Sequence, residues 1–231
     1  MDLIEKRIGL HEELTAAARG DVPVDLLIRG GSFLNVHTGE ILKGNVAVHK
    51  GFVVGVMTGD MEAAETLDAR GKTVIPAFID PHVHIESSMV LPPAYAEVAG
   101  PGGTGTVFTD PHEIVNVMGA DGFRLMKDNS ADLPVRFFFD IPTCVPSKRG
   151  AETAGAEVGP SEIRGMADAG GRKLGELMSY PEIVSGDPLL NEIVKTGWRL
   201  GLPRDAHFPM TDILGSLFAA LSGREKFSVG L

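Results

Sequence analysis

Apolar segments alternate with segments of helical pattern through the chain after residue 72, and this alternation limits the possible folds more than any other feature. The predicted strands are Val74–Ile79, Gly105–Thr109, Val135–Ile141, Lys173–Met178 and a short one near Arg204–His207. The predicted helices between and after them are Pro93–Ala99, Val117–Asn129, Ser161–Ala169, Leu189–Leu200 and Asp212–Leu221. A βα repeat predicts parallel strands with helices outside, and therefore an α/β fold whose chemistry lies at the C-terminal ends of the strands.

The first 72 residues follow other patterns. Residues 1–20 predict an amphipathic helix that ends at Gly20. Residues 21–72 then show a period of two, which predicts a small β region with a turn at Gly30-Gly31. The predicted strands are 24–29, 32–36, 44–49 and 52–56. A region of this size cannot bury both faces of a sheet by itself, so we expect it to pack against another part of the protein.

Composition excludes several classes of partner. The 231 residues are 43% hydrophobic, which is ordinary for a globular protein, and the formal charge is −10. This acidic balance argues against binding to nucleic acid or to an anionic membrane. No apolar run approaches the ~20 residues of a membrane helix, and the charged N-terminus does not resemble a secretory signal. The single cysteine, Cys144, cannot form an intrachain disulfide, so we expect a cytoplasmic protein.

Two histidines follow the first predicted strand in the run Asp80-Pro81-His82-Val83-His84. In an extended segment, residues i and i+2 point to the same side. His82 and His84 can therefore direct two imidazoles at one point, as a metal site requires. The alternative is two unrelated histidines at the end of a strand, but the flanking Asp80 and Glu86 favour metal binding.

The other strand ends carry similar residues. His112 follows the second strand with Asp110 and Glu113 beside it, and His207 ends the fifth. Glu176 places a charge inside an otherwise apolar strand, and burying an unpaired carboxylate is costly. Its partner is either a nearby lysine or arginine, or a divalent cation. The histidines at the same edge favour the cation.

Histidine and carboxylate ligands without cysteine suit Zn, Mn or Fe. Asp205, two residues before His207, is a candidate for orienting a metal-ligating histidine through a hydrogen bond. Cys144 lies in a proline-flanked loop, where it either lines the pocket or fills a small space in the core.

The run Ile79–Met89 resembles the first metal motif of the amidohydrolase superfamily, in the form found in bacterial adenine deaminases. Further segments agree with that family in order: 109–114, 142–146 with 152–155, and 175–178 followed by 186–187. The resemblance covers roughly residues 24 to 210.

This resemblance implies a (β/α)₈ barrel, a β-sandwich built from both ends of the chain, and a binuclear centre of Mn or Fe, with Zn possible. It implies that His82 and His84 hold one metal and His207 the other. Glu176 would bridge the two, where hydantoinase-type relatives carry a carbamylated lysine. The implied reaction converts adenine and water to hypoxanthine and ammonia through a metal-activated hydroxide. Glu176 and His207 would be catalytic, and Ser87, Asp110, His112 and Glu113 would lie around a purine substrate. A homo-oligomer is expected.

The chain also departs from the family pattern. The family has a further metal histidine on the sixth strand and an aspartate on the eighth, but this sequence ends at Leu231. We therefore expect an incomplete barrel of about five βα units over residues 73–231 and impaired catalysis, because general acid–base steps typically contribute ~10²–10⁴-fold. Smaller departures are Ala77, where a glycine is usual, and Gly105 in a threonine-rich strand start.

Two alternatives to an adenine deaminase stay open. One is a cyclic amidohydrolase of the hydantoinase or dihydroorotase type, although Glu176 in place of a lysine counts against it. The other is a non-catalytic remnant that uses its exposed strand edges for interaction.

Overall fold

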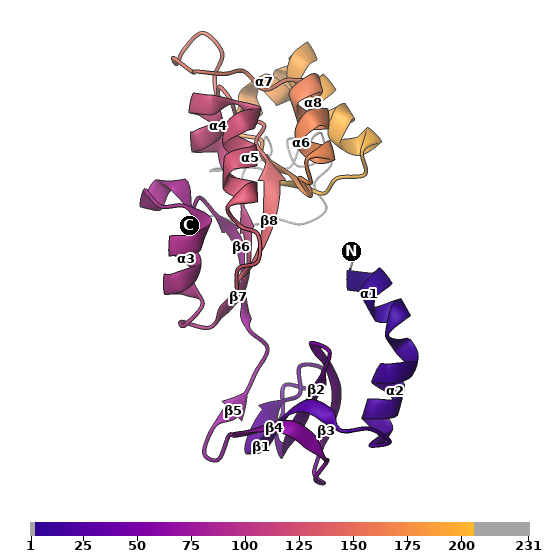
Figure 1. Cartoon of the computed structure of the whole chain (residues 1–231). Coiled ribbons are helices and arrows are strands. Elements are labelled where there is room, and N and C mark those ends of the chain that lie inside the picture. The colour runs from indigo at the N-terminus through magenta and orange to yellow at the C-terminus, as the bar shows by residue number, and fades with distance from the viewer. Residues whose placement is uncertain (1–2, 206–231) are drawn as a thin grey trace. The chain divides into compact units, whose positions relative to one another are not determined.

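The computed structural model describes residues 3–205, so the predicted helix Asp212–Leu221 and His207 lie outside the described residues. The chain divides into two compact units, Met1–Pro76 and Ala77–Leu231. Most elements of both units are labelled in Figure 1. Within the described residues, no helix is long and apolar enough to cross a membrane.

The first unit begins with two helices, α1 (Leu3–Gly9) and α2 (His11–Arg19), where the sequence predicted one helix over residues 1–20. Leu10 separates them, because its backbone angles (φ −102°, ψ 3°) are not those of an α-helix. Gly20 ends α2 in the left-handed conformation at φ 80°, as predicted.

The sheet of this unit is built around β1 (Val24–Leu34). This strand pairs antiparallel with β2 (Ile41–His49) and parallel with β4 (Ala63–Asp68) and β5 (Thr73–Val74). The strand β3 (Phe52–Met57) pairs with the other edge of β2. The small core joins Ala17 of α2 to Val24, Leu27 and Ala47 of the sheet. Val53 and Leu67 stay exposed, as expected for a region that cannot bury both faces.

Gly30-Gly31 was predicted to be a turn, but it forms an irregularity inside the single strand β1. The register with β2 shifts between Ile28 and Gly31, and Gly30 has φ +78°. A Cβ at Gly31 would lie 2.8 Å from the carbonyl oxygen of Ala69. The glycines therefore allow the neighbouring segment to approach β1 closely, so the strand bends and continues.

The second unit contains one parallel sheet whose strands follow one another in sequence order. The strands are β6 (Phe78–Val83), β7 (Thr104–Thr109), β8 (Arg136–Ile141), β9 (Lys173–Glu176) and β10 (Arg204–Asp205). The helices between them are α3 (Pro92–Ala99), α4 (His112–Met118), α5 (Ala120–Asp128), α6 (Pro160–Asp168), α7 (Tyr180–Ser185) and α8 (Pro188–Arg199), with a short 3₁₀ turn at η1 (Glu86–Ser88). Five parallel strands in sequential order with helical crossovers form part of the wall of a (β/α) barrel, as predicted.

Two boundaries differ from the sequence prediction. The first strand of this unit is β6, Phe78–Val83, and it continues through Pro81, whereas the apolar run predicted a buried strand at Val74–Ile79. β6 is at the edge of the described sheet, where a proline is tolerated, and Ile79 is 62% exposed. The predicted helix Val117–Asn129 is two helices, because Gly119 at φ +63° separates α4 from α5.

The two faces of the sheet carry different side chains. The face toward the helices is apolar, with Phe139, Ile141 and Leu174 packed among helix residues such as Phe123 and Ile163. Alternation along the strands turns their neighbours to the other face. There Phe108 and Phe138 stack with ring centroids 5.0 Å apart, and the Nζ of Lys173 lies 5.8 Å from the Phe108 centroid.

Candidate metal centre

Three of the predicted ligands meet at the C-terminal end of the sheet. The Nε2 atom of His82 lies 3.1 Å from the Nε2 atom of His84 and 3.1 Å from Oε1 of Glu176. The Nε2 atom of His84 lies 3.9 Å from Oε2 of Glu176. His82 is on β6 and Glu176 is on β9, so the curl of the sheet across β7 and β8 brings them together. Two imidazoles and a carboxylate arranged around one point can hold a divalent cation.

A backbone carbonyl group fixes the ring of His84 through the nitrogen that does not face the cluster. Its Nδ1 atom lies 2.7 Å from the carbonyl oxygen of Asp110, which can only accept a hydrogen bond. Nδ1 is therefore the donor of this hydrogen bond, and Nε2 is the ring nitrogen that faces His82 and Glu176. A backbone carbonyl behind a histidine is a common way to fix the ring of a metal ligand.

A second group of three ligands shares Glu176 with the first. The Nδ1 atom of His112, which begins α4, lies 3.6 Å from Oε2 of Glu176 and 4.0 Å from Oδ2 of Asp110. The rings of His84 and His112 are 4.3 Å apart at a tilt of 36°. Asp110 is fully buried, and its Oδ2 accepts a hydrogen bond of 2.8 Å from the backbone N–H of Glu176. Asp110 therefore holds the strand that carries Glu176.

The electrostatics of the cluster favour a charged Glu176. Burial raises the pKa of Glu176, but the hydrogen bond from His82 and the charges of the three histidines outweigh burial and leave this pKa below its usual value. The hydrogen bond to Glu176 likewise raises the pKa of His82, against the effect of burial. Burial raises the pKa of Asp110, although His112 and the N–H of Glu176 oppose it.

The residues present fit a divalent cation. Buried carboxylates in this unit are Asp110, Asp140, Glu176 and Asp205, and the partly buried Lys173 pairs with Asp140 and Asp205. These carboxylates outnumber the lysine, and burial raises the pKa of Asp110 and raises that of Asp140 to about 8. Oδ1 of Asp110 and Nδ1 of both His82 and His112 are buried with no hydrogen-bond partner among the described residues. Such groups are costly to bury unless something pairs with them, and a cation would lower that cost.

Two other predicted site residues, Ser87 and Glu113, are not part of the two ligand groups. Ser87 Oγ donates a hydrogen bond of 2.6 Å to Oε1 of Glu113, whose backbone N–H donates to Oε1 of Glu86. Ser87 and Glu113 therefore form a pair between η1 and the first turn of α4. His207 lies outside the described residues, so its predicted role as ligand and catalytic residue stays a prediction.

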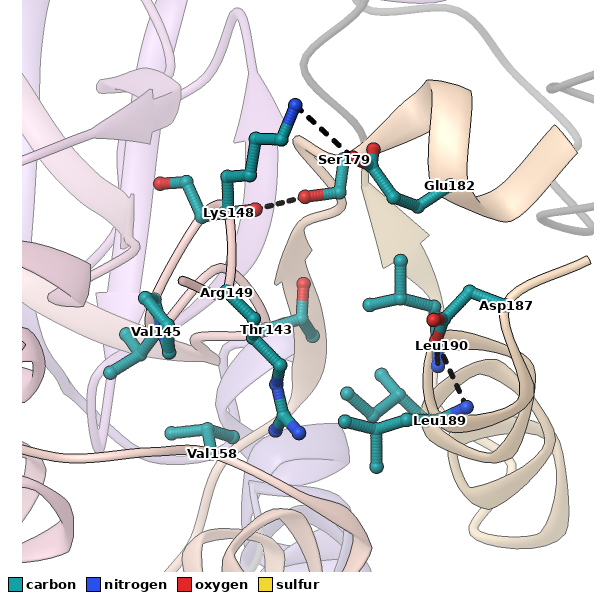
Figure 2. Close-up of a pocket in the computed structure, with 13 residues that line it drawn as sticks. Thr143, Val145, Lys148, Arg149, Val158, Ser179, Glu182, Asp187, Leu189 and Leu190 are labelled. Carbon is teal, nitrogen blue, oxygen red and sulfur yellow. Dashed lines mark hydrogen bonds and ion pairs between the residues drawn. The ribbon is translucent and has the colours of Figure 1, made fainter. Parts of the chain in front are cut away.

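A cavity of about 170 Å³ opens beyond the C-terminal ends of β8 and β9, between the loop after β8 and helices α7 and α8. Its lining includes the apolar Val145, Val158 and Leu189, and in Figure 2 the Arg149 side chain extends between Val158 and Leu189 while Lys148 points toward Glu182. Thr143, which also lines it, donates its hydroxyl to the carbonyl oxygen of Glu176. Thr143 thus connects the cavity to the strand that carries Glu176. Cys144 is buried and is not among its lining residues.

The sequence prediction assigned no role to Asp140 and Lys173, although the structure places both on the sheet face below the cluster. Nζ of Lys173 lies 2.7 Å from Oδ2 of Asp140 and 3.1 Å from Oδ2 of Asp205. The signal that drew attention to Glu176, a charge within an apolar strand, was also present at Asp140 in the segment Phe137–Ile141.

The sequence of this chain is similar to those of known proteins. Residues 73–220 match the amidohydrolase family. Over 204 residues the chain is 43% identical to an adenine deaminase of Moorella thermoacetica, and over 214 residues it is 41% identical to one of Ruegeria pomeroyi. These matches cover 86% and 90% of this chain but 34% and 35% of the relatives. The chain thus spans about a third of the length of the curated relatives it matches.

The fold is also shared with solved structures of lower sequence similarity. The L-hydantoinase of Arthrobacter aurescens superimposes with a TM-score of 0.58 at 23% identity, over 80% of this chain and 40% of that enzyme. An N-isopropylammelide isopropylaminohydrolase of Burkholderia multivorans gives 0.55 at 14% identity, over 86% of this chain and 56% of that one. The sheet topology and the residues gathered at its C-terminal edge agree with the family match. The chain belongs to the amidohydrolase family.

Proposed function

We propose that the cluster of His82, His84 and Glu176 is part of the metal centre of an adenine deaminase-type hydrolase, which converts adenine and water to hypoxanthine and ammonia. The observation that carries the proposal is the meeting of two Nε2 atoms and one carboxylate at the C-terminal strand ends. The 43% identity to an adenine deaminase supports the choice of reaction.

Glu176 is the proposed bridging ligand. It belongs to both groups of three ligands, one with His82 and His84 and one with Asp110 and His112. His207 is the further proposed ligand of the second metal and a catalytic residue with Glu176, and it lies outside the described residues. Nitrogen and carboxylate ligands suit Mn or Fe, and also Zn. A divalent cation held there would acidify water and so supply the nucleophile for attack on the amino-bearing carbon of the purine.

The protein's own groups would position and exchange protons with the substrate. The charged form of Glu176 is favoured in the structure, so its carboxylate can accept a proton as the nucleophile forms. We assign Ser87, Asp110, His112 and Glu113 to the surroundings of the purine. Of these, Ser87 and Glu113 offer a hydroxyl and a carboxylate that are already paired with each other. We place this activity in the cytoplasm, because the one cysteine forms no intrachain disulfide.

The test is ammonia release from adenine by the Mn²⁺-loaded chain. We expect release of ammonia by the wild-type chain and its loss in Glu176→Gln. The matched control is Glu192→Gln, which removes an exposed carboxylate on α8 that pairs with Lys195, so this variant should retain the wild-type rate. A cyclic amide serves as the second substrate. Hydrolysis of the cyclic amide without release of ammonia from adenine would contradict the proposal and favour a hydantoinase-type reaction.

A further inference from the structure

Near the proposed metal centre, the partly buried Lys173 contacts carboxylates of two neighbouring strands, β8 and β10. We propose that Lys173 is a positioning residue of the metal centre, which holds the carboxylate of Asp205 against the ring of His82. This inference rests on the proposed metal centre, and it adds a residue that is not a ligand.

The contacts form one continuous path. Nζ of Lys173 lies 3.1 Å from Oδ2 of Asp205, and the same oxygen lies 3.7 Å from Nδ1 of His82. On the opposite side of that ring, Nε2 lies 3.1 Å from Oε1 of Glu176. Lys173 is thus connected through one carboxylate to the nitrogen that faces away from the ligand cluster. A carboxylate at that position fixes the tautomer of a ligating histidine and raises its basicity.

The lysine itself is held in place from two further sides. Asp140, its register partner on β8, lies 2.7 Å away and is fully buried. The ring of Phe108 on β7 lies 5.8 Å from the ammonium group. The Lys173 side chain is only 15% exposed, so its position is fixed by packing as well as by charge. A flexible surface lysine could not orient a carboxylate in this way, because it would sample many rotamers.

The ring nitrogen at the end of the path needs a partner. Nδ1 of His82 is buried and makes no hydrogen bond with the described residues, because 3.7 Å exceeds hydrogen-bonding distance. His84 has its Nδ1 satisfied by a backbone carbonyl at 2.7 Å. The two histidines therefore differ. The backbone fixes His84, whereas His82 depends on a side chain whose own position depends on Lys173.

The experiment measures Zn²⁺ affinity by calorimetry and the ring signals of ¹⁵N-labelled histidine in the Zn²⁺-loaded full chain, with His82→Ala used to assign the His82 signals. In the wild-type chain we expect an Nδ1 proton on His82 that is slow to exchange with water. In Lys173→Met we expect this signal to broaden or disappear and the Kd for Zn²⁺ to rise at least tenfold, within the ~10–100-fold range typical of such partners.

A matched control is Lys195→Met, which removes an exposed lysine of α8 paired with Glu192 and should leave both readouts unchanged. Since Lys173→Met removes the ammonium group beside two buried carboxylates, the double variant Lys173→Met/Asp140→Asn, which has the wild-type formal net charge, provides a second test. It should show the same loss of the His82 signal. Asp205→Asn should also reproduce it, and adding Lys173→Met to Asp205→Asn should change the Kd little further.

The outcomes separate this inference from the proposed function. If the wild-type chain binds no Zn²⁺ or Mn²⁺, the proposed metal centre is wrong. If the wild-type chain binds metal and the folded Lys173 variants keep both the His82 signal and a Kd within twofold, the metal centre stands and the positioning role of Lys173 is overturned.

Discussion

At the scale of single residues, Gly175 decides whether Asp110 can reach β9. A Cβ built on Gly175 would lie 2.1 Å from Oδ2 of Asp110, and that oxygen accepts the hydrogen bond from the N–H of Glu176. Only a residue without a side chain leaves room for this contact. The glycine is thus required by a close approach between strands.

We predict that Gly175→Ala displaces the Asp110 carboxylate and lowers both stability and metal content. Leaving a buried acceptor and donor unpaired costs about 1–3 kcal/mol, which urea unfolding would detect. Gly165→Ala is the control, because nothing lies within 4 Å of a Cβ at that position in α6. The control should be neutral or stabilising by up to about 1 kcal/mol, since alanine favours a helix. Equal stability and metal content in Gly175→Ala and the wild type would contradict the role given to this glycine.

At the scale of elements, Ala77 and Gly105 face each other. A Cβ on Gly105 of β7 would lie 2.5 Å from the Cβ of Ala77, in the segment just before β6. The methyl group of Ala77 is therefore opposite a glycine. Neither position alone reveals this, because they are 28 residues apart in the sequence.

We predict that Gly105→Ala destabilises the protein by about 1–3 kcal/mol through overpacking of β6 against β7. Adding Ala77→Gly should restore most of that loss, and Ala77→Gly alone should have a small effect. The measurement is a double-mutant cycle of unfolding free energies. Additive effects of the two substitutions would show that the residues do not share one space.

The N-terminus of α8 gives a second prediction at this scale. Oδ1 of Asp187 accepts hydrogen bonds from the backbone N–H groups of Leu189, at 3.0 Å, and Leu190, at 2.9 Å, as drawn in Figure 2. We predict that Asp187→Ala lowers the unfolding free energy by about 1 kcal/mol, because these N–H groups lose their acceptor. Asp187→Asn keeps an acceptor oxygen and should cost less. If thermal unfolding shows the same midpoint for the wild type and both variants, the cap does not contribute to stability.

At the scale of the whole molecule, metal binding should be coupled to folding. The proposed ligands come from β6 and the residue after it, from β9 and from the start of α4, so the cluster exists only when these elements are assembled. We predict that Mn²⁺ at 100 times its Kd adds about 2.7 kcal/mol to the stability of the chain, and that a chelator removes this gain. Differential scanning fluorimetry would measure it. A chain with the same melting temperature in Mn²⁺ and in chelator would contradict the coupling.

The metal content of variants tests the ligand assignment directly. We predict that Glu176→Gln abolishes binuclear loading, since the bridging carboxylate loses its charge, and that His82→Ala and His84→Ala each reduce the metal bound per chain. Elemental analysis gives the ratio, with Glu192→Gln as the control. Two metals per chain in Glu176→Gln would disprove the bridging role. Unchanged content in both histidine variants would disprove the assignment of their ligands.

Much of the architecture followed from local patterns in the sequence. The alternation of strands and helices after residue 72 is a local property, and it predicted the parallel sheet and most of its helices. The i, i+2 spacing of His82 and His84 and the charge of Glu176 inside an apolar strand were equally local. Local patterns gave wrong strand boundaries where the pairing between strands determines the structure. Gly30-Gly31 continued one strand because neighbours lie on both sides of β1, and β6 began later than its apolar run predicted because it lies at an edge.

Only the tertiary structure decided which of these residues meet. The curl of the sheet brings Glu176 of β9 to His82 of β6 across two intervening strands. The contacts of Gly175 with Asp110 and of Lys173 with Asp205 likewise depend on strand register and on close backbone approach. Such contacts join residues that are far apart in the chain, so their side-chain types can be read from the sequence but their distances cannot. The sequence by itself determined the chemical groups that are available, and the packing of the strands determined which of them act together.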